Sequence, residues 1–240
     1  MDVSEFERGL ACLETPRELW NLILQFFAQG PIQHVLYHHV PPPMGAEDGT
    51  RVRVFGHGLP EEFLHLYSAG RLYRQNPRFQ RAFRIVDPFY FDEAVVQASA
   101  EHTTFVEAIR GLHYDKGLGV PVFGPMGRNG YAGLGFVPGV ERLSPEMVLD
   151  VQWACQLAHL RYCDFLLEDQ GPPPRLSARE TEILGWVARG KSNASIAGIL
   201  GISAHTVDAH LRRVYDKLGV FDRISAAIRG IGIGLIHADC

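Results

Sequence analysis

Three short segments near the end of the chain each begin at a serine and end at a glycine. A serine side chain caps the first turn of a helix, and glycine takes the left-handed backbone conformation that terminates one. Helices this short are not stable alone, so the pattern restricts this part of the chain to a small all-helical bundle. The bounding pairs are Ser177 with Gly190, Ser192 or Asn193 with Gly201, and Ser203 with Gly219.

The second and third of these helices form a predicted helix-turn-helix unit. A short helix, a tight turn and a longer helix make up this motif, which many DNA-binding proteins share. A further helix after the third completes the bundle. The four predicted helices span Ala178–Arg189, Ala194–Leu200, Ala204–Leu218, and Asp222 or Arg223 to Ile231.

The third helix of this bundle would carry the DNA contacts. In a helix-turn-helix it lies in the major groove, and its N-terminal residues meet the base edges. Arg212 and Arg213 can each pair with guanine or clamp a phosphate, whereas Lys191 and Ser192 lie where a helix end approaches the sugar–phosphate backbone. The predicted DNA contacts are Lys191, Ser192, Ala204, His205, Thr206, Asp208, Ala209, Arg212, Arg213 and Lys217.

Charge is distributed unevenly along the chain. Residues 171–240 contain nine Lys/Arg and six Asp/Glu, a balance of +3, although the whole chain has a net charge of −4. A basic segment joined to an acidic one is typical of a nucleic-acid-binding module attached to another domain. At the junction lies Gln170-Gly171-Pro172-Pro173-Pro174, whose prolines exclude helix and favour an extended spacer. We expect a first domain over 1–168, a linker over 169–175 and a DNA-binding domain over 176–240.

The first domain mixes helix and strand patterns. Helices on both sides of a small antiparallel sheet give an α/β/α sandwich, so we expect an α+β chain with an all-α C-terminal domain of four helices. The predicted strands span His34–Val40, Arg51–Phe55, Gly117–Phe123 and Gly130–Val137. The predicted helices span Glu5–Phe27 with an interruption near Thr15-Pro16, Pro60–Arg84 with a break at Asn76-Pro77, Ala98–Leu112, and Ser144–Glu168.

Residues 175–231 resemble the DNA-binding domain of LuxR-type regulators. The resemblance rests on motifs such as Leu176-Ser177-x-Arg179-Glu180-x-Glu182-Ile183-Leu184 and Gly190-Lys191-Ser192-Asn193. Glu180, Leu184 and Gly190 occupy three positions that hardly vary in that family. Physically, the glutamate can cap a helix or orient a basic side chain, the leucine belongs to the core, and the glycine allows the left-handed turn.

Residues from about 10 to 168 resemble the autoinducer-binding domain of quorum-sensing LuxR-type regulators. The motifs are Pro60-Glu61-Glu62-Phe63-x-x-x-Tyr67, Asn76-Pro77, Pro88-Phe89-Tyr90-Phe91-Asp92 and Gly117-Leu118-Gly119-Val120-Pro121. The resemblance implies a small-molecule signal, which in this family is commonly an acyl-homoserine lactone, bound between the sheet and the helix Pro60–Gln75. The ligand-binding residues it implies are Phe63, Tyr67, Asn76, Phe91, Gly117 and Gly133.

Several of these positions depart from the family pattern. Phe63 and Phe91 stand where tryptophans are usual, and Asn76 stands where an aspartate accepts the amide N–H of the lactone. Phe63 cannot donate a hydrogen bond, and an asparagine gives a weaker one than a carboxylate. Common straight-chain lactones are therefore expected to bind poorly. The open alternatives are a signal of another class, a lactone held by altered contacts, and a pocket filled by the protein's own side chains.

No catalytic or metal-binding pattern competes with this interpretation. We find no nucleophile elbow, P-loop or metal-spaced Cys/His set, so neither an enzyme nor a metal site is expected. His34 and His38 share one face of a strand, where two histidines without a third ligand are expected to be surface residues. No cofactor is expected beyond the signal molecule.

The remaining features concern compartment and partners. The four cysteines form no disulfide framework, and the acidic N-terminus has no signal-peptide pattern, so we expect a cytoplasmic protein. No apolar run is long enough to span a membrane. Ser144–Glu168 is apolar on more than one face, which favours a homodimer that binds a near-palindromic operator on double-stranded DNA. The family resemblance also implies RNA polymerase as a partner.

Overall fold

The computed structural model describes residues 1–44, 52–95, 102–169 and 171–237. These residues form two compact units, one from Met1–Val40 and Val52–Phe165 and the other mainly from the residues after Leu166. No helix within the described ranges is long and apolar enough to cross a membrane. The helices are α1 (Val3–Leu10), α2 (Pro16–Phe27), α3 (Glu61–Ser68), η1 (Leu72–Gln75), α4 (Pro77–Ala82), α5 (Phe91–Val95), α6 (Thr103–Ala108), η3 (Pro125–Gly127), α7 (Pro145–Asp169), α8 (Ala178–Ala188), α9 (Asn193–Leu200), α10 (Ala204–Leu218) and α11 (Arg223–Gly232). The strands are β1 (Ile32–Val40), β2 (Arg53–His57), β3 (Phe89–Tyr90), β4 (Gly117–Phe123) and β5 (Asn129–Phe136).

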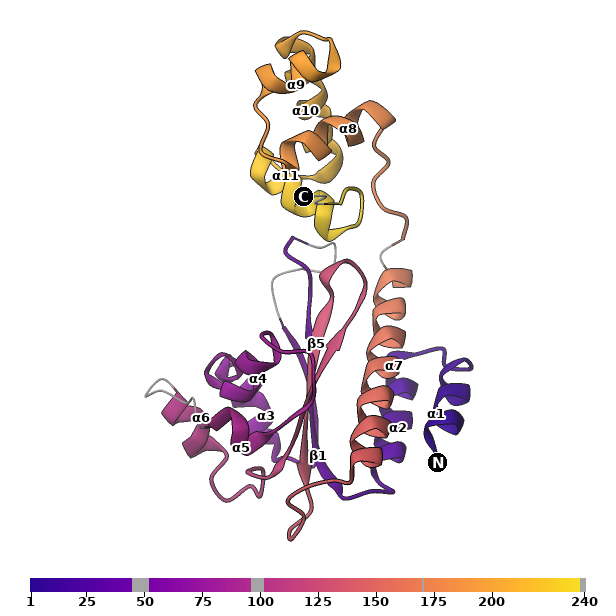
Figure 1. Ribbon diagram of the computed structural model, residues 1–240, viewed down its shortest axis with the longest axis vertical. Helices are drawn as coiled ribbons and strands as arrows, with labels where there is room; N and C mark the ends of the chain where they lie inside the picture. Colours follow the sequence, from indigo (N-terminus) through magenta and orange to yellow (C-terminus); the bar gives the residue numbers. More distant parts are fainter. Residues whose placement is uncertain (45–51, 96–101, 170, 238–240) are drawn as a thin grey trace. The chain divides into compact units, whose positions relative to one another are not determined.

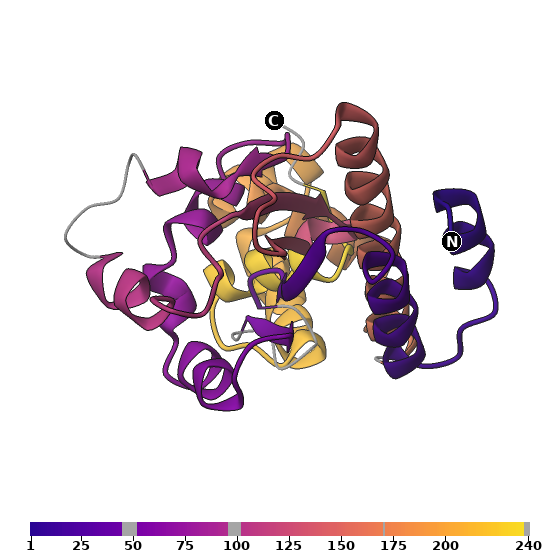
Figure 2. The same cartoon turned by 90° about the horizontal axis from the view of Figure 1, so that it is seen from below.

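The first unit is built around one antiparallel sheet with the strand order β2-β1-β5-β4-β3. Helices α3 to α6 cover one face of the sheet, and α2 and α7 cover the other, with α1 outside α2 (Figures 1 and 2). β4 and β5 are buried almost throughout because helices lie on both faces. The predicted α+β class, with an α/β/α sandwich followed by a helical domain, is confirmed.

Capping residues set most helix boundaries as predicted. Thr15 caps α2 in a capping box with Glu18, and Pro16 occupies the first turn, so the chain breaks between α1 and α2 at the expected place. Ser177 and Ser203 also cap α8 and α10. Each side chain accepts a backbone N–H from the third helical residue.

Three predicted elements differ from the structure. The segment Pro60–Arg84 has a second break, because α3 ends near Gly70 and Arg71 takes a left-handed φ of 57° before η1 begins. The helix predicted over Ala98–Leu112 is shorter, since α6 covers Thr103–Ala108; residues 98–101 lie outside the described residues. The predicted strand Arg51–Phe55 is shifted toward the C-terminus, because β2 pairs over Arg53–His57; Arg51 is also outside the described residues.

The second unit is the predicted four-helix bundle. Gly201 and Gly219 end α9 and α10 with φ values of 64° and 62°, in the left-handed region that side chains disfavour. Apolar residues of α8, α9 and α10 form one core cluster. A second contains residues of α8 and α10, Ala226 of α11, and Val220 and Ile236 on either side of α11. α9 and α10 are therefore held as a helix-turn-helix.

Candidate functional site

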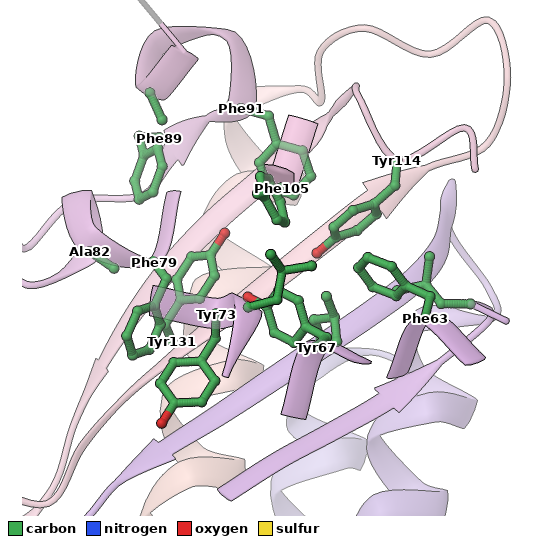
Figure 3. Packing of buried hydrophobic residues seen from close by; sticks show 14 residues of the cluster. Phe63, Tyr67, Tyr73, Phe79, Ala82, Phe89, Phe91, Phe105, Tyr114 and Tyr131 are labelled. Atoms are coloured by element: carbon green, nitrogen blue, oxygen red, sulfur yellow. The ribbon is translucent and has the colours of Figure 1, made fainter. Parts of the chain in front are cut away.

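The six predicted ligand residues all lie on the face of the sheet covered by α3 to α6. Phe63, Tyr67 and Phe91 belong to one buried aromatic cluster, and Asn76 is also buried. The cluster takes rings from α3, η1, α4, α5, α6 and the strands β3 and β5 (Figure 3). The hydroxyl groups of Tyr67, Tyr114 and Tyr131 are turned toward the same central space in Figure 3, whereas the Tyr73 hydroxyl points away. This layer is consequently apolar in bulk with a few convergent polar groups.

A chain of hydrogen bonds passes through the middle of this cluster. Asn76 Nδ2 donates to Tyr67 Oη at 2.7 Å, and His38 Nε2 lies 2.9 Å from the same oxygen. The Tyr131 carbonyl next to Nδ1 can only accept, so the neutral His38 ring carries its proton on Nδ1, and Nε2 accepts the proton of the Tyr67 hydroxyl. His38 Nδ1–H then donates to the Tyr131 carbonyl oxygen at 3.2 Å. Asn76, Tyr67 and His38 each have hydrogen-bond partners within this series.

Asn76 is engaged by the protein itself. Its Oδ1 atom accepts the backbone N–H of Arg78 at 3.0 Å, which caps α4, while its amide N–H binds Tyr67. Burial raises the pKa of Tyr67 well above its ordinary value, and burial also lowers the pKa of His38 to about 3. Both side chains are therefore neutral at physiological pH, and Asn76 uses one N–H and its carbonyl oxygen within the protein.

Arg78 places a guanidinium inside the same layer, with 1% of the residue exposed. Its Cζ atom lies 3.8 Å from the centre of the Phe91 ring and 5.6 Å from that of Phe105. Nη1 donates to the Tyr114 carbonyl at 2.8 Å, and Nε has no hydrogen-bond partner among the described residues. Burial lowers the pKa of Arg78, but guanidinium remains protonated in proteins. A buried positive charge thus adjoins the predicted ligand residues.

The glycines on β4 and β5 make room for aromatic rings. A Cβ atom at Gly117 would lie 2.4 Å from Phe91 Cε2, and one at Gly133 would lie 2.5 Å from Tyr114 Oη. Tyr114 Oη donates to the Gly133 carbonyl at 3.1 Å. The space above both glycines is occupied by the protein's own side chains.

A small cavity lies on the opposite face of the sheet, beneath α2 and α7. It has a volume of about 50 Å³, and Trp20, Phe27, Tyr37, Cys155 and Tyr162 contribute to an almost wholly apolar lining. It contains none of the residues predicted to bind the signal.

Three possible metal ligands, His39, His159 and Cys163, also converge on this opposite face, with their ligand atoms within 4.8 Å of one another. Both ring nitrogens of His159 are engaged, Nδ1 by the Tyr37 hydroxyl at 2.6 Å and Nε2 by the Arg128 carbonyl at 2.9 Å. A metal would therefore have to displace one of these hydrogen bonds.

The histidine prediction was wrong. His34 is 4% exposed and His38 is 0% exposed, because helices cover both faces of β1 and leave no solvent-facing side. Arg78, Tyr114 and Tyr131 were not predicted as site residues. An arginine two positions after Asn76, next to a predicted helix start, was the available signal for the first of them; the two tyrosines had no distinguishing pattern.

The predicted DNA contacts lie on and around α10. Val207, Leu211, Val214 and Leu218 face the core at helical spacing. Ala204, His205, Arg212 and Arg213 are exposed on the remaining surface, together with Lys191 and Ser192 before α9, whereas Thr206, Asp208 and Ala209 are half-buried. Two exposed arginines, Arg212 and Arg213, thus lie next to each other on α10.

Two of these side chains have ionic partners within the domain. Arg212 pairs with Asp208 one turn earlier at 2.9 Å, with 76% of the arginine side chain exposed. Lys217 Nζ lies 2.6 Å from Glu180 Oε2, and Glu180 is buried. Burial raises the pKa of Glu180, but the hydrogen bonds from Lys217 and Ser177 outweigh it and hold the pKa below its ordinary value. Lys217 therefore joins α10 to α8, while Arg213 has no such constraint among the described residues.

Family models match both parts of the chain. The model described as "Autoinducer binding domain" matches residues 15–162, and the model described as "Bacterial regulatory proteins, luxR family" matches residues 174–229. The transcriptional activator AhyR of Aeromonas hydrophila is 30% identical over 189 residues, which cover 74% of this chain and 71% of AhyR. BjaR1 of Bradyrhizobium diazoefficiens, also a transcriptional activator, is 25% identical over 97% of this chain and 95% of its own.

Solved structures show the same fold. The crystal structure of SdiA from Escherichia coli matches with a TM-score of 0.76 and 22% identity over 98% of this chain and 100% of SdiA. A second structure of SdiA, in complex with octanoyl-rac-glycerol, matches equally well over 95% of its chain. The similarity extends through both domains of those structures.

Proposed function

The chain belongs to the LuxR family of bacterial regulatory proteins, and on that basis we propose that it binds double-stranded DNA as a homodimer through α10. The observation that carries the proposal is the exposure of Arg212 and Arg213 on a helix whose other face forms the core of a helix-turn-helix. Lys191, Ser192, Ala204, His205 and Thr206 would contact the backbone and the first bases. Half-buried Asp208 and Ala209 would lie at the margin of the contact, and Lys217 would mainly position α10.

Exposed apolar side chains support the homodimer. Leu149, Trp153 and Leu160 lie along one face of α7 and are 65%, 52% and 38% exposed. Leu149 and Trp153 line a groove together with Val86, Pro121 and Phe123. A contiguous exposed apolar surface of this kind marks a protein interface, and a second copy of the chain is the occupant that a helix-turn-helix regulator requires.

The second domain has its own exposed apolar face. On α11 and in the turn before it, Phe221 is 98% exposed and Ile224 is 68% exposed, with Ile228 and Ile231 on the same side. A dimer formed there would present two α10 helices to one duplex, and the operator would be a near-palindrome. Domain limits at 1–168 and 176–240, joined by 169–175, would leave each surface on its own folded unit.

Ligand control would act through the buried aromatic layer. A small molecule other than a straight-chain acyl-homoserine lactone fits this layer best, because Phe63 offers no donor and Asn76 is already hydrogen-bonded at both ends. Such a regulator needs no catalytic group, cofactor or metal, and it would act in the cytoplasm on RNA polymerase at its operator.

The packing of the layer favours a second candidate, a regulator that folds and binds DNA without any ligand. Tyr114 occupies the space over Gly133, and Phe91 occupies the space over Gly117. In that case the aromatic layer is a permanent core and the operator affinity does not respond to small molecules.

DNA binding is tested with the full-length protein and fragments of its parent genome. Selected fragments should show a protected operator with two half-sites, and the complex should contain two protein chains. Arg213→Ala should weaken binding by about 1–3 kcal/mol, whereas Arg84→Ala removes an equal charge from an exposed surface of the first domain and should change little. Absence of any footprint at low salt would refute the proposal.

A further inference from the structure

Resting on the proposed function, we infer that the signal is a small arylalkanoic acid whose carboxylate pairs with Arg78. The inference begins with the state of that guanidinium. Arg78 is 1% exposed and forms no ion pair with any described carboxylate. A charge withdrawn from water is costly unless it is paired and fully hydrogen-bonded.

The groups now around Arg78 compensate its charge only in part. The Phe91 ring, 3.8 Å from Cζ, contributes a cation–π contact, and the Tyr114 carbonyl accepts one N–H at 2.8 Å. Neither group carries a negative charge. The Asp115 carboxylate acts on Arg78 electrostatically but forms no ion pair with it, and Nε has no acceptor among the described residues. A planar carboxylate matches the fork of a guanidinium and can accept two of its N–H groups at once.

The position of Tyr114 defines the shape of the acid. Its ring lies over Gly133 and Gly135, its hydroxyl donates to the Gly133 carbonyl, and its own carbonyl meets Arg78. Tyr114 therefore spans the site from the sheet to the guanidinium. 3-(4-Hydroxyphenyl)propanoate has the same atoms from hydroxyl to carbonyl carbon, with a carboxylate in place of the peptide carbonyl.

Tyr114 is also the side chain best placed to leave. It belongs to the loop between α6 and β4, not to a helix or strand, and His113 before it has a left-handed φ of 51°. Release of the loop breaks the hydrogen bonds of Tyr114 to the Gly133 carbonyl and to Arg78, so the bound acid has to replace both. With Tyr114 displaced, the aromatic acid occupies the vacated volume. The Tyr131 hydroxyl, which has no hydrogen-bond partner among the described residues, adjoins it.

The test compares 3-(4-hydroxyphenyl)propanoate with its neutral amide by calorimetry on the full-length protein. The acid should bind about ten- to a hundred-fold more tightly than the amide, because only the acid supplies charge-assisted hydrogen bonds. Arg78→Met should abolish that preference. Arg81→Met is the matched control, since Arg81 lies on the same helix, stacks on Phe89 at 5.3 Å and pairs with Glu93; it should keep the preference. Tyr114→Ala should increase the affinity for the acid.

Equal affinity for acid and amide, or no binding of either at millimolar concentration, would overturn the inference. The comparison on the unmodified protein needs no variant, so a misfolded Arg78→Met protein leaves the inference open to refutation. Operator footprints recorded on the same preparations separate the two failures. A footprint without acid binding refutes only the ligand class and favours the self-filled core, whereas loss of both refutes the proposed function.

Discussion

Each domain has an arginine site in its proposed binding region, and the two sites lie in opposite surroundings. On α10, Arg212 and Arg213 lie in solvent, whereas Arg78 is enclosed by the rings of Phe91 and Phe105. A guanidinium in water attracts any polyanion, and salt screens that attraction. A guanidinium that has lost its water is selective, because its partner must replace the lost solvation in one geometry.

Some histidines show the same contrast, although His57, His65 and His113 of the first domain are exposed. His38, His39 and His159 are buried in the first domain, while His205 of the second is exposed on the helix that would face DNA. The buried groups of the first domain contribute to its stability and, under the proposed function, to its choice of ligand. The exposed groups on α10 would, under the same proposal, contribute to the affinity for DNA. Conditions that charge buried groups should therefore destabilise the first domain more than the second.

Low pH should produce the largest difference in stability between the two domains. Burial lowers the pKa of His38 and His39 to about 3 and that of His159 to about 4, with the charge of His159 adding to the effect on His39. In the unfolded chain these groups take up protons below their ordinary pKa of about 6.5. Their contribution to stability is complete above that pH and is lost progressively as pH falls toward the folded values. At about pH 5.5 the loss is roughly 1.4 kcal/mol for each histidine and up to about 4 kcal/mol in total.

Hydrogen exchange resolved by peptide measures this loss in each domain. The free energy of opening should fall in β1 and α7 far more than in α8 to α11. His38→Gln should reduce the steepness of the pH dependence by about one proton. His65→Gln, at an exposed position on α3, should leave it unchanged. An equal fall in both domains would contradict the contrast.

The hydrogen-bond chain through Tyr67 should give the next largest effect. Tyr67→Phe removes the oxygen that links Asn76 to His38 and leaves a buried donor and a buried acceptor unpaired. We expect a loss of about 2–4 kcal/mol in the free energy of unfolding, measured by urea titration. Tyr73→Phe is the control, because the Tyr73 hydroxyl points away from this chain (Figure 3) and its removal should cost under about 1 kcal/mol. Similar losses for the two variants would show that the chain contributes little.

The contrast also explains which features the sequence could reveal. Caps such as Ser177 and Thr15 act within a few residues, so helix boundaries in α2, α8 and α10 were predictable. The exposed positions of α10 followed from its helical period. The fold of the first domain was predictable because its motifs are local and ordered along the chain.

The contacts inside the buried aromatic layer could not be predicted in the same way. Arg78 and Tyr114 are 36 positions apart, and their contact depends on how α4 meets the loop before β4. No local pattern encodes that distance. The exposure of His38 was mispredicted for a related reason: whether a strand face meets solvent depends on helices distant in sequence.

The second domain offers a smaller test through the ion pair between buried Glu180 and Lys217. Glu180→Gln keeps a polar side chain near Ser177 but removes the charge that binds Lys217. We expect a loss of about 1–2 kcal/mol in the free energy of unfolding at neutral pH. Because the folded pKa of Glu180 is depressed, the difference should be present above its unfolded pKa of about 4.3 and disappear as pH falls through the folded value. Glu182→Gln breaks the exposed pair with Arg179 and should cost at most about 0.5 kcal/mol.

The smallest expected effect concerns Asp208 and would sharpen the description of α10. Asp208→Asn releases Arg212 from its ion pair and removes a negative charge from the DNA-facing helix. An exposed pair of this kind contributes little to folding, so the stability should not change measurably. Affinity for the operator should rise by less than about ten-fold, and the rise should shrink as salt increases, because the gain comes from phosphate attraction. Asp216→Asn, at an exposed position on the same helix without an ion pair to a described residue, controls for net charge. If Asp208→Asn instead weakens binding and alters the preferred bases, Asp208 reads the operator directly, and α10 recognises DNA with more than its arginines.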